Sequence, residues 1–481
     1  MSAAVDSAVY RPAEFHRFEA GGRQFVYLVP SAGVFELNEV SGRILDLLAA
    51  APHSAEMLAE RLPQYAPRDV FEALEELYQS HAIQTPEGFH EPPQQPPPQF
   101  PLQSLVLNLT NQCNLSCQYC YEFGEDKIAT PDGKPKFMDW ETATQAVDYF
   151  FRDSAGRRSL HITFFGGETL MNFPLLKRVV EYARNKAAGE GRSLDFSLTT
   201  NATLLTPQII QFLSENQIGV TVSIDGPKEM NDALRVFSTG KGSYDIIAPK
   251  VKQLLAEHKT RPIAARVTLT AQVADVLKIF RHLTEELGFQ EVGFAPVTTS
   301  SKALYSIGPS GLDRVLEQFR ELALEYRDWA LAGRHHAFSN VSDTIAEIHQ
   351  GVSKSHPCGA GLGLVGVGPS GDISPCHRFV DSDPHTLGHV SHGMDRDKQA
   401  DFLTRGHIHS KYDCHSCWAR PVCAGGCHHE AFVRYGDTGH PNLHYCDWIR
   451  GWTDLCLQIY GEIAVRNPEF LAHFDRRKTL Q

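Results

Sequence analysis

The strongest constraint on the fold is a sixfold alternation of short apolar runs and helical patterns between residues 102 and 333. Each apolar run has the length and composition of a buried strand, and apolar residues at helical spacing follow it. The expected strands cover 104–109, 160–165, 194–200, 219–224, 263–269 and 291–297, and the expected helices cover Glu141–Phe151, Leu175–Ala187, Pro207–Glu215, Tyr244–Ala256, Val276–Leu287 and Leu312–Leu331. Consecutive β-then-α units predict a parallel sheet. We therefore expect an α/β fold, a partial (β/α)6 barrel of the triosephosphate isomerase type, with functional residues at the carboxyl ends of its strands.

A proline-rich stretch separates this region from a smaller module before it. Glu91–Pro101 is more than half proline, which predicts an extended linker. Before it, three short strands with tight turns at 21–22 and 31–33 precede three short amphipathic helices. This order predicts a winged-helix-like β3α3 domain over 1–90 and a linker over 91–101, followed by the barrel over 102–333 and a cysteine-rich region with a C-terminal helix over 334–481.

Charge and hydropathy argue against several partners. The 481 residues include 45 Lys and Arg against 57 Asp and Glu, which gives a net charge of −12. A protein that mainly binds nucleic acid is expected to carry a positive charge, so this net charge argues against such a partner. Residues 1–90 hold six Arg, no Lys and thirteen acidic residues, which argues against DNA binding by the winged-helix-like module. No run of about 18 apolar residues predicts a membrane span, and the N-terminus lacks the features of a signal peptide. We expect a cytoplasmic protein with no membrane partner.

Eleven cysteines in such a chain favour metal ligands or catalytic groups over disulfides. Cys113, Cys117 and Cys120 follow the first expected strand with the spacing CxxxCxxC. A structural zinc site needs four ligands, and this loop offers three with no histidine at ligand spacing. Three thiolates suit a 4Fe-4S cluster that leaves one iron free. The spacing favours such a cluster, with zinc and plain buried cysteines as the alternatives.

The loop, with Tyr119 before its last cysteine, resembles that of the radical S-adenosylmethionine superfamily. Further segments match the family at the ends of later strands. Gly166-Gly167-Glu168 resembles the GGE motif that meets the amino group of the ligand, and Ser223 and Arg235 match a segment that reaches its ribose and carboxylate. The resemblance thus implies contacts to S-adenosylmethionine from Tyr119, Gly166, Gly167, Glu168, Ser223 and Arg235, together with Asn201, after Thr200 at the end of the third strand, and Arg266 on the fifth.

This resemblance implies one-electron chemistry. Cys113, Cys117 and Cys120 would hold the catalytic 4Fe-4S cluster, whose free iron chelates S-adenosylmethionine. An electron from a donor such as flavodoxin or ferredoxin would cleave the sulfonium bond, and a 5′-deoxyadenosyl radical would abstract a hydrogen from the substrate. The protein would orient the reactants and exclude water.

Seven cysteines in the last third of the chain form a second pattern. Two strand-like runs around a Pro-Ser-Gly-Asp turn predict a hairpin that brings Cys358 and Cys376 together. The full spacing resembles the SPASM extension, which binds auxiliary 4Fe-4S clusters in peptide- and protein-modifying members of the superfamily. The resemblance assigns one auxiliary cluster to Cys414, Cys417, Cys423 and Cys446, and another to Cys358, Cys376 and Cys427, so that three 4Fe-4S clusters are expected.

The second auxiliary set has only three matched cysteines. Sulfatase-maturing relatives supply a fourth just upstream of Cys358, where this chain has none. The fourth iron of this auxiliary cluster would therefore have no protein ligand, or it would be bound by His356, Cys456 or an exogenous ligand. Relatives that form thioether crosslinks share the three-cysteine pattern, and an open iron could bind a substrate thiolate. His377 stands where sulfatase-maturing relatives have an aspartate that acts as a base, which argues against that activity.

The sequence does not assign a role to several other polar residues. Candidates for moving protons are Tyr121, Glu168, Asp225, Asp232 and His377. The pair His428-His429 and the run 407–409 are interpreted as loop or solvated histidines.

The N-terminal module resembles a PqqD-like peptide-recognition domain, which implies a ribosomal peptide or protein substrate bound through it. The whole architecture is similar to radical S-adenosylmethionine peptide maturases, most of all to those that install Cys-to-Asp and Cys-to-Glu thioether bonds in the small subunit of quinohemoprotein amine dehydrogenase. The alternatives are a related maturase that makes an α-carbon thioether, a carbon–carbon crosslink or a sulfatase-type modification. From a different class, a zinc-stapled adaptor without catalysis is also possible.

Overall fold

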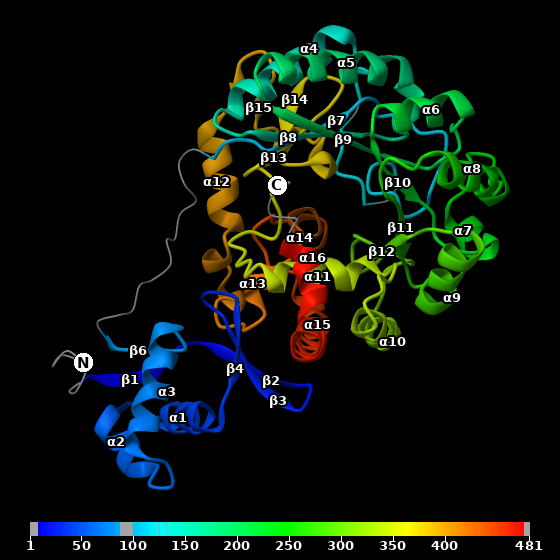
Figure 1. The fold of residues 1–481 in the computed structure, drawn as a ribbon. Helices are drawn as coiled ribbons and strands as arrows, with labels where there is room; N and C mark the ends of the chain where they lie inside the picture. Colours follow the sequence, from blue (N-terminus) through cyan, green and yellow to red (C-terminus); the bar gives the residue numbers. More distant parts are fainter. Residues whose placement is uncertain (1–7, 87–99, 125, 131, 476–481) are drawn as a thin grey trace.

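A computed structural model describes residues 8–86, 100–124, 126–130 and 132–475 of the chain. The predicted linker over 91–101 lies outside these residues, apart from Phe100 and Pro101. The molecule has a curved central sheet flanked by helices, and a small N-terminal module at one end (Figure 1).

Six parallel strands form the centre of a ten-stranded sheet, in the order β12-β11-β10-β9-β8-β7. They are β7 (Ser104–Asn108), β8 (Ser159–Phe165), β9 (Ser193–Thr200), β10 (Gly219–Ser223), β11 (Ile263–Leu269) and β12 (Glu291–Pro296). All six predicted strands are therefore confirmed to within a few residues. The predicted α/β class with a partial barrel is confirmed as well, because the spatial order follows the chain order and every adjacent pair is parallel.

A helix follows each of these strands, and the first five lie along the outer side of the arc (Figure 1). The helices are α4 (Trp140–Asp153), α5 (Phe173–Gly189), α6 (Pro207–Glu215), α8 (Tyr244–Glu257), α9 (Val276–Arg281) and α10 (Pro309–Leu331). Two local features differ from the prediction. The short helix α7 (Lys228–Leu234) precedes α8, and a π-helical turn over His282–Glu286 continues α9.

The sheet does not end at β7. Strand β13 (Leu364–Val367) pairs in parallel with β7, and β14 (Asp372–Ser374) pairs antiparallel with β13, which confirms the predicted hairpin. Two short strands, β15 (Gly388–His389) and β16 (Gly393–Met394), complete the edge. The sheet thus continues past the predicted boundary at 333/334, from the barrel into the cysteine-rich region.

The remaining helices lie in and around that region. They are α11 (Ser339–His349), α12 (Arg396–Gly406), α13 (Arg420–Cys423), α14 (His428–Tyr435), α15 (Cys446–Arg466) and α16 (Pro468–Asp475). Helix α15 packs against α10 and α11 and contributes to the core of the barrel half.

The N-terminal module contains the predicted three strands and three helices. Strands β2 (Phe15–Ala20), β3 (Arg23–Leu28) and β4 (Gly33–Leu37) form an antiparallel sheet, and the helices are α1 (Glu39–Ala50), α2 (Ala55–Arg61) and α3 (Pro67–Gln79). A second small sheet was not predicted; it consists of β1 (Val9–Pro12), β5 (His53–Ser54) and β6 (Ile83–Gln84). These strands are too short for a visible alternation of apolar residues.

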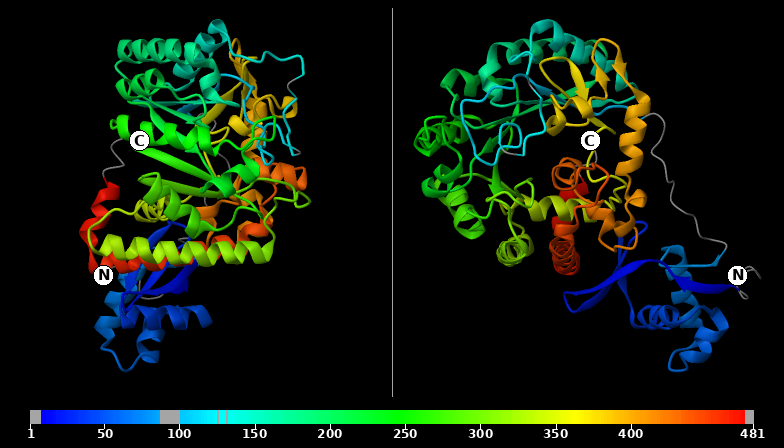
Figure 2. Two further views of the ribbon diagram at one scale, coloured as in Figure 1. Left: turned by 90° about the vertical axis from the view of Figure 1, so that its right-hand side faces the viewer. Right: turned by 180° about the vertical axis from the view of Figure 1, so that it is seen from behind.

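The module packs against the C-terminal helix α15 through β2 (Figure 2). The His16 ring stacks on Trp418 with 3.6 Å between the ring centroids, and its Nε2 lies 2.6 Å from Asp454 Oδ1. Phe18 and Phe25 belong to the same hydrophobic core as the barrel, whereas the three helices of the N-terminal module enclose a separate core.

Candidate functional site

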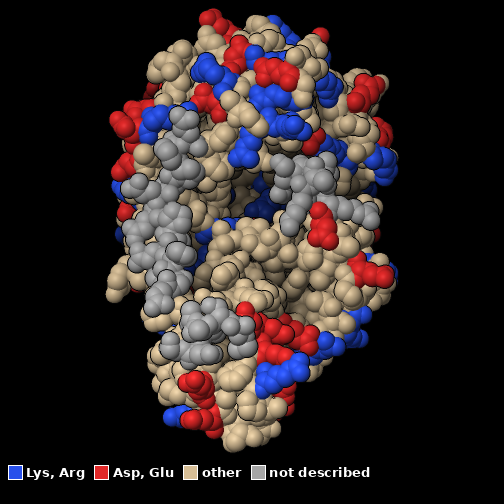
Figure 3. All heavy atoms as spheres, turned by 60° about the vertical axis from the view of Figure 1, so that its left-hand side comes forward, with Lys and Arg blue, Asp and Glu red and all other residues tan. Residues whose placement is uncertain are grey.

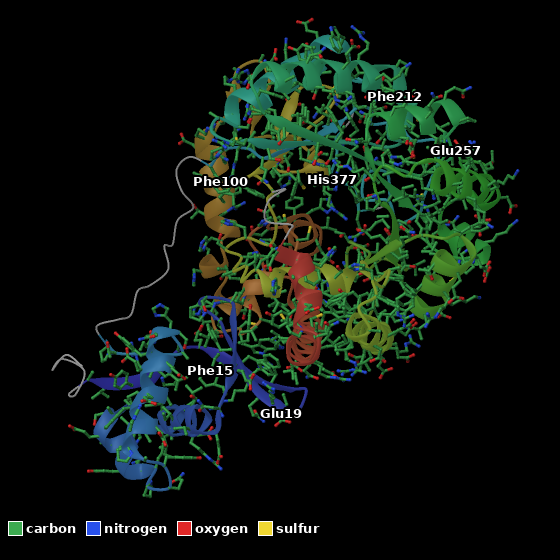
Figure 4. The ribbon with its side chains drawn as sticks, in the orientation of Figure 1. Phe15, Glu19, Phe100, Phe212, Glu257 and His377 are labelled. Atoms are coloured by element: carbon green, nitrogen blue, oxygen red, sulfur yellow. The ribbon has the colours of Figure 1, made fainter. Side chains whose placement is uncertain are left out.

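A cavity of about 590 Å³ lies at the carboxyl ends of the barrel strands. The predicted site residues among its lining are Cys113, Cys117, Tyr119, Cys120, Gly166, Gly167, Asn201, Ser223, Arg235 and Arg266. His377 and Arg378, from the cysteine-rich region, line the same cavity, and Figure 4 shows His377 within the arc of the sheet. Figure 3 shows a hollow in one face of the molecule with Lys or Arg atoms at its visible depth.

Hydrogen bonds from a neighbouring segment hold the cysteine loop after β7. The backbone N–H groups of Ser116 and Gln118 donate to the carbonyl oxygens of Val236 and Leu234, at 2.7 and 3.2 Å. Because Leu234 ends α7 and Val236 lies just beyond it, the loop is fixed against the segment that contains Arg235.

The three thiols of this loop are only partly exposed. Burial is the main cause that raises the pKa of Cys113 to about 12 and that of Cys120 to about 11, and it also raises the pKa of Cys117. A buried thiolate needs a positive partner, and a metal cluster would supply one.

The two glycines of the GGE segment pack against the start of the cysteine loop. A Cβ atom on Gly166 would lie 2.2 Å from the carbonyl oxygen of Thr110, and one on Gly167 would lie 2.3 Å from that of Gln112. The N–H groups of Gly167 and Glu168 donate to the same two oxygens, at 3.0 and 2.9 Å. Glycine is therefore required here for contact between two backbone segments.

Glu168 lies behind the cavity wall and is 1% exposed. Its carboxylate accepts hydrogen bonds from Thr200 Oγ1 at 2.7 Å, from the Asn201 N–H at 2.7 Å and from the Leu170 N–H at 3.1 Å. This position ties the end of β8 to the end of β9. The Asn201 side chain lines the cavity, and its Nδ2 lies 3.8 Å from Cys113 Sγ.

Tyr119, Asp225 and Arg235 form a buried polar cluster beside the loop. The Tyr119 hydroxyl donates to Asp225 Oδ2 and accepts from Arg235 Nη1, both at 2.6 Å, and Arg235 Nη1 lies 4.0 Å from Asp225 Oδ2. Burial raises the pKa of Asp225, whereas the charge of Arg235 opposes that rise. Arg235 Nε is buried and has no hydrogen-bond partner among the described residues, so one donor remains for a ligand.

Ser223 and Arg266 occupy neighbouring positions on the barrel wall. Ser223 ends β10 and pairs in register with Arg266 of β11, which itself pairs with Gly293 of β12. Arg266 is exposed toward the cavity. Desolvation by the surrounding cavity, followed by the charge of Arg378, lowers the pKa of Arg266, while Asp343 opposes that shift.

Four cysteines predicted to share an auxiliary cluster lie together. The charges of Cys423, Cys446 and Cys417 are among the causes, after burial, that raise the pKa of Cys414 to about 12. The charges of Cys423 and Cys417 likewise raise the pKa of Cys446, after burial. The thiols of the predicted set therefore interact electrostatically with one another.

Cys358, Cys376 and Cys427 form the other group. After burial, the charges of Cys427 and Cys358 raise the pKa of Cys376 to about 12. The buried Lys411 interacts electrostatically with both groups. Burial lowers its pKa, and the charges of four cysteines, two from each group, oppose that shift. Its Nζ donates to the Ala424 carbonyl oxygen at 3.3 Å.

The two protein side chains considered as a fourth ligand have other contacts. His356 Nε2 lies 2.9 Å from the Leu403 carbonyl oxygen, and its Nδ1 lies 3.0 Å from Ser355 Oγ. Cys456 is buried in α15 among residues of the main core. His356 thus has hydrogen-bond partners outside the three-cysteine group, and Cys456 packs in the main core.

Aromatic and imidazole rings surround the segment after Cys376. His377 packs on Phe165 with 4.4 Å between ring centroids, and burial lowers its pKa to about 3. Tyr121 packs edge-on against His377 and His429. The interpretation of His428-His429 as solvated was wrong: the two are 2% and 1% exposed, because both begin α14 on its buried side. In the 407–409 run, His407 is 3% exposed, so the interpretation as solvated is wrong for this residue too.

Asp232, another candidate for moving protons, lies away from this wall. It is not among the residues that line the cavity, and its Oδ1 accepts from the N–H of Tyr244 at 2.8 Å at the start of α8.

The ten clustered thiols fit iron–sulfur ligation, because soft thiolates in groups of three and four suit these clusters. Among the described residues, no group of three or more His, Cys, Asp or Glu side chains is arranged to hold a single metal ion. The cavity beside Cys113, Cys117 and Cys120, with the spare donor of Arg235, fits a polar ligand such as S-adenosylmethionine. No helix in the described part of the chain is long and apolar enough to cross a membrane.

Comparisons with known proteins match part of the chain to a family model and other stretches to individual proteins. Residues 107–267 match the family model described as Radical SAM superfamily. An uncharacterized protein of Methanocaldococcus jannaschii is 36% identical over 30% of this chain, a match that spans 45% of that relative's own length. A serine-type anaerobic sulfatase-maturating enzyme of Bacteroides thetaiotaomicron is 26% identical over 72% of this chain and 86% of its own length.

Two solved structures share the fold over most of the chain. Native anSMEcpe with bound AdoMet and the Cp18Cys peptide superposes with a TM-score of 0.61 at 20% identity, over 78% of this chain and 99% of its own. Streptococcus suis SuiB bound to the precursor peptide SuiA gives a TM-score of 0.50 at 15% identity, over 91% and 99% of the two chains.

Proposed function

The chain carries a radical SAM domain and is an enzyme, and from this premise we propose that it is a peptide maturase that joins a cysteine to an aspartate or glutamate of its substrate by a thioether bond. As an enzyme, it is not the non-catalytic zinc adaptor considered above. The product class resembles the crosslinks made in quinohemoprotein amine dehydrogenase small-subunit biogenesis.

One observation carries this proposal: the cysteine loop and the segment after Cys376 face the same cavity. Arg378 lines that cavity and interacts electrostatically with Cys376 and Cys427. The three-cysteine group therefore adjoins the place where a substrate would meet the first site. A three-thiol group leaves a coordination position for a substrate thiolate.

The crosslink replaces one C–H bond and one S–H bond with one C–S bond. One hydrogen leaves as an atom, the other as a proton, and one electron remains to be accepted. Bound S-adenosylmethionine and its 4Fe-4S cluster would supply the hydrogen-atom acceptor, the two auxiliary 4Fe-4S clusters would take the electron, and a donor such as flavodoxin or ferredoxin would start the reaction.

The protein's own residues position these groups. Cys113, Cys117 and Cys120 would hold the first cluster, with Gly166 and Gly167 allowing the turn after β8 to support their loop. Asn201, Ser223 and Arg235 would contact S-adenosylmethionine, and Glu168 would fix the wall behind it. The Tyr119 and Asp225 contacts keep Arg235 oriented.

We assign recognition of the substrate to the N-terminal module, as the resemblance to PqqD-like domains implies. Its antiparallel sheet has β4 as an edge strand, and an edge strand can accept an extended peptide. The peptide-bound state of SuiB, whose fold spans 91% of this chain, supports a peptide substrate.

A sulfatase-type modification is the second candidate, favoured by the 26% identity to a sulfatase-maturating enzyme. His377 weighs against it, because sulfatase-maturing relatives have an aspartate at the matching position. An oxidation confined to one side chain would create a carbonyl group and no bond between residues, so the product distinguishes the two candidates.

The test is anaerobic turnover of peptides encoded near the gene that contain a cysteine and an acidic residue. We expect a product lighter by two hydrogen atoms, unreactive toward a thiol alkylating reagent, with no fragmentation between the joined residues. Peptides with Cys→Ser or Asp→Asn changes and the enzyme variant Cys376→Ala are the controls. A product that reacts with a hydrazide would favour the sulfatase-type activity, and a link to an α-carbon or between two carbons would overturn the assigned bond.

A further inference from the structure

Two arginines from different halves of the chain share one wall of the cavity. Arg266 belongs to β11 of the barrel, and Arg378 follows Cys376 in the cysteine-rich region. Their charges interact, since Arg378 contributes to lowering the pKa of Arg266. Like charges held close together favour a bound anion.

Neither guanidinium group forms a hydrogen bond or an ion pair within the described part of the chain; their recorded interactions are electrostatic or with a ring. Arg378 lies over the Tyr121 ring, with 4.7 Å from Cζ to the centroid. This contact is not a hydrogen bond, so the N–H donors of Arg378 remain available to another group. Arg235, by contrast, is already bound to Tyr119.

The Tyr121 hydroxyl is a third donor at this wall. It is buried and has no hydrogen-bond partner among the described residues, although Tyr121 lines the cavity. An unpaired buried hydroxyl is costly, and a ligand oxygen would satisfy it.

Acidic residues also lie near the two arginines. Glu122, Glu291 and Asp343 line the cavity, and the charge of Asp343 acts on Arg266. Glu430 acts on Arg378, but its Oε1 already lies 3.3 Å from Arg434 Nε and 3.2 Å from His444 Nε2.

We propose that Arg266, Arg378 and the Tyr121 hydroxyl form a carboxylate-binding subsite for the acidic side chain of the peptide that is to be crosslinked. Two guanidinium groups and a hydroxyl match the acceptor oxygens of a carboxylate. The subsite lies beside the group of Cys358, Cys376 and Cys427, so the acidic residue and the cysteine of one peptide would be held next to each other. This inference rests on the proposed function and adds which residues select the acidic partner.

The experiment measures equilibrium binding of two fluorescein-labelled peptides to the anaerobic holoenzyme. The peptides contain one cysteine and differ only in Asp against Asn. We expect the wild type to prefer the Asp peptide by about tenfold, the strength of one charge-assisted hydrogen-bonded contact. Arg378→Gln should abolish the preference and Tyr121→Phe should reduce it, whereas Arg378→Lys should keep part of it.

The control Arg281→Gln removes an arginine from the exposed face of α9 and should leave the preference unchanged. Iron content and circular dichroism establish that each variant is folded and loaded. Equal binding of the Asp and Asn peptides by the wild type, or no binding of either, would overturn the subsite.

S-adenosylmethionine also has a carboxylate, so its binding is measured in the same variants. Arg378→Gln should leave it unchanged; weaker S-adenosylmethionine binding with an intact Asp preference would assign the arginine to the cofactor and overturn the proposal. The readout needs no turnover. A preference for Asp without a thioether product would therefore contradict the proposed function and leave the subsite standing.

Discussion

The Tyr119 hydroxyl donates a hydrogen bond to Asp225, with 2.6 Å between the phenol oxygen and Oδ2. This contact joins the cysteine loop to the segment after β10, and the same oxygen accepts from Arg235. One hydroxyl thus satisfies two charged, buried side chains from outside the loop.

We expect Tyr119→Phe to lower the free energy of unfolding of the metal-free protein by about 1–3 kcal/mol, because Asp225 and Arg235 each lose a partner. Urea unfolding measures the loss. The matched control is Tyr182→Phe, whose hydroxyl donates to Asp148 at 2.8 Å in a more exposed position. Equal losses in the two variants would contradict a special role for the Tyr119 hydroxyl.

Gly167→Ala should destabilise the protein by about 1–3 kcal/mol, because the new methyl group overlaps the backbone of Gln112. The strain falls on the cysteine loop, so we also expect less iron at the first site. Gly42→Ala is the control: it lies within α1 with open space around its Cβ position, and alanine should stabilise that helix by about 0.5–1 kcal/mol. Thermal unfolding and iron analysis decide; an unchanged Gly167→Ala protein would show that the two segments can separate freely.

Iron analysis tests two of the three thiol groups separately. The anaerobically purified protein should contain about twelve irons per chain, and Cys113→Ala/Cys117→Ala/Cys120→Ala should contain about four fewer. The fourfold variant at Cys414, Cys417, Cys423 and Cys446 should lose a similar amount. Cys456→Ala should keep its iron, because that thiol lies in the core. Stoichiometric zinc in place of iron would exclude the cluster assignment.

His385 should make stability depend on pH. Burial, and after it the charge of Arg405, lowers its pKa from 6.5 to about 4. Protonation therefore favours the unfolded chain: stability is highest above pH 6.5 and falls as the pH drops toward 4. His385→Gln should remove this loss, so the free energy of unfolding of the wild type, relative to that of the variant, should be lower at about pH 5 than at about pH 7.5. The same difference at both values would refute the assignment.

The sequence predicted the parts of the molecule that depend on local pattern. The six strands follow from apolar runs, and the Gly21-Gly22 turn follows from residues that tolerate positive φ, which the structure confirms at 58° and 77°. Motifs at strand ends also met in one cavity, because parallel strands present their carboxyl ends on one side.

Other features depend on contacts between distant segments and leave no local signal. The meeting of Arg266 and Arg378 requires the cysteine-rich region to close over the barrel. The sequence also could not show that the Cβ positions of the two GGE glycines, which line the cavity, face the backbone of Thr110 and Gln112. Only the packing of two segments could reveal that contact.

The ladder between β7 and β13 has a practical meaning for anyone who shortens or recombines this chain. A cut at 333/334 would remove β13 from one side of Ser104–Asn108. The N–H and C=O groups on that side would then be unpaired, and such an exposed strand edge promotes aggregation. The barrel and the cysteine-rich region are therefore not interchangeable parts. A chimaera that borrows the cysteine-rich region of a relative must bring Leu364–Val367 with it, in register with the strand that precedes Cys113.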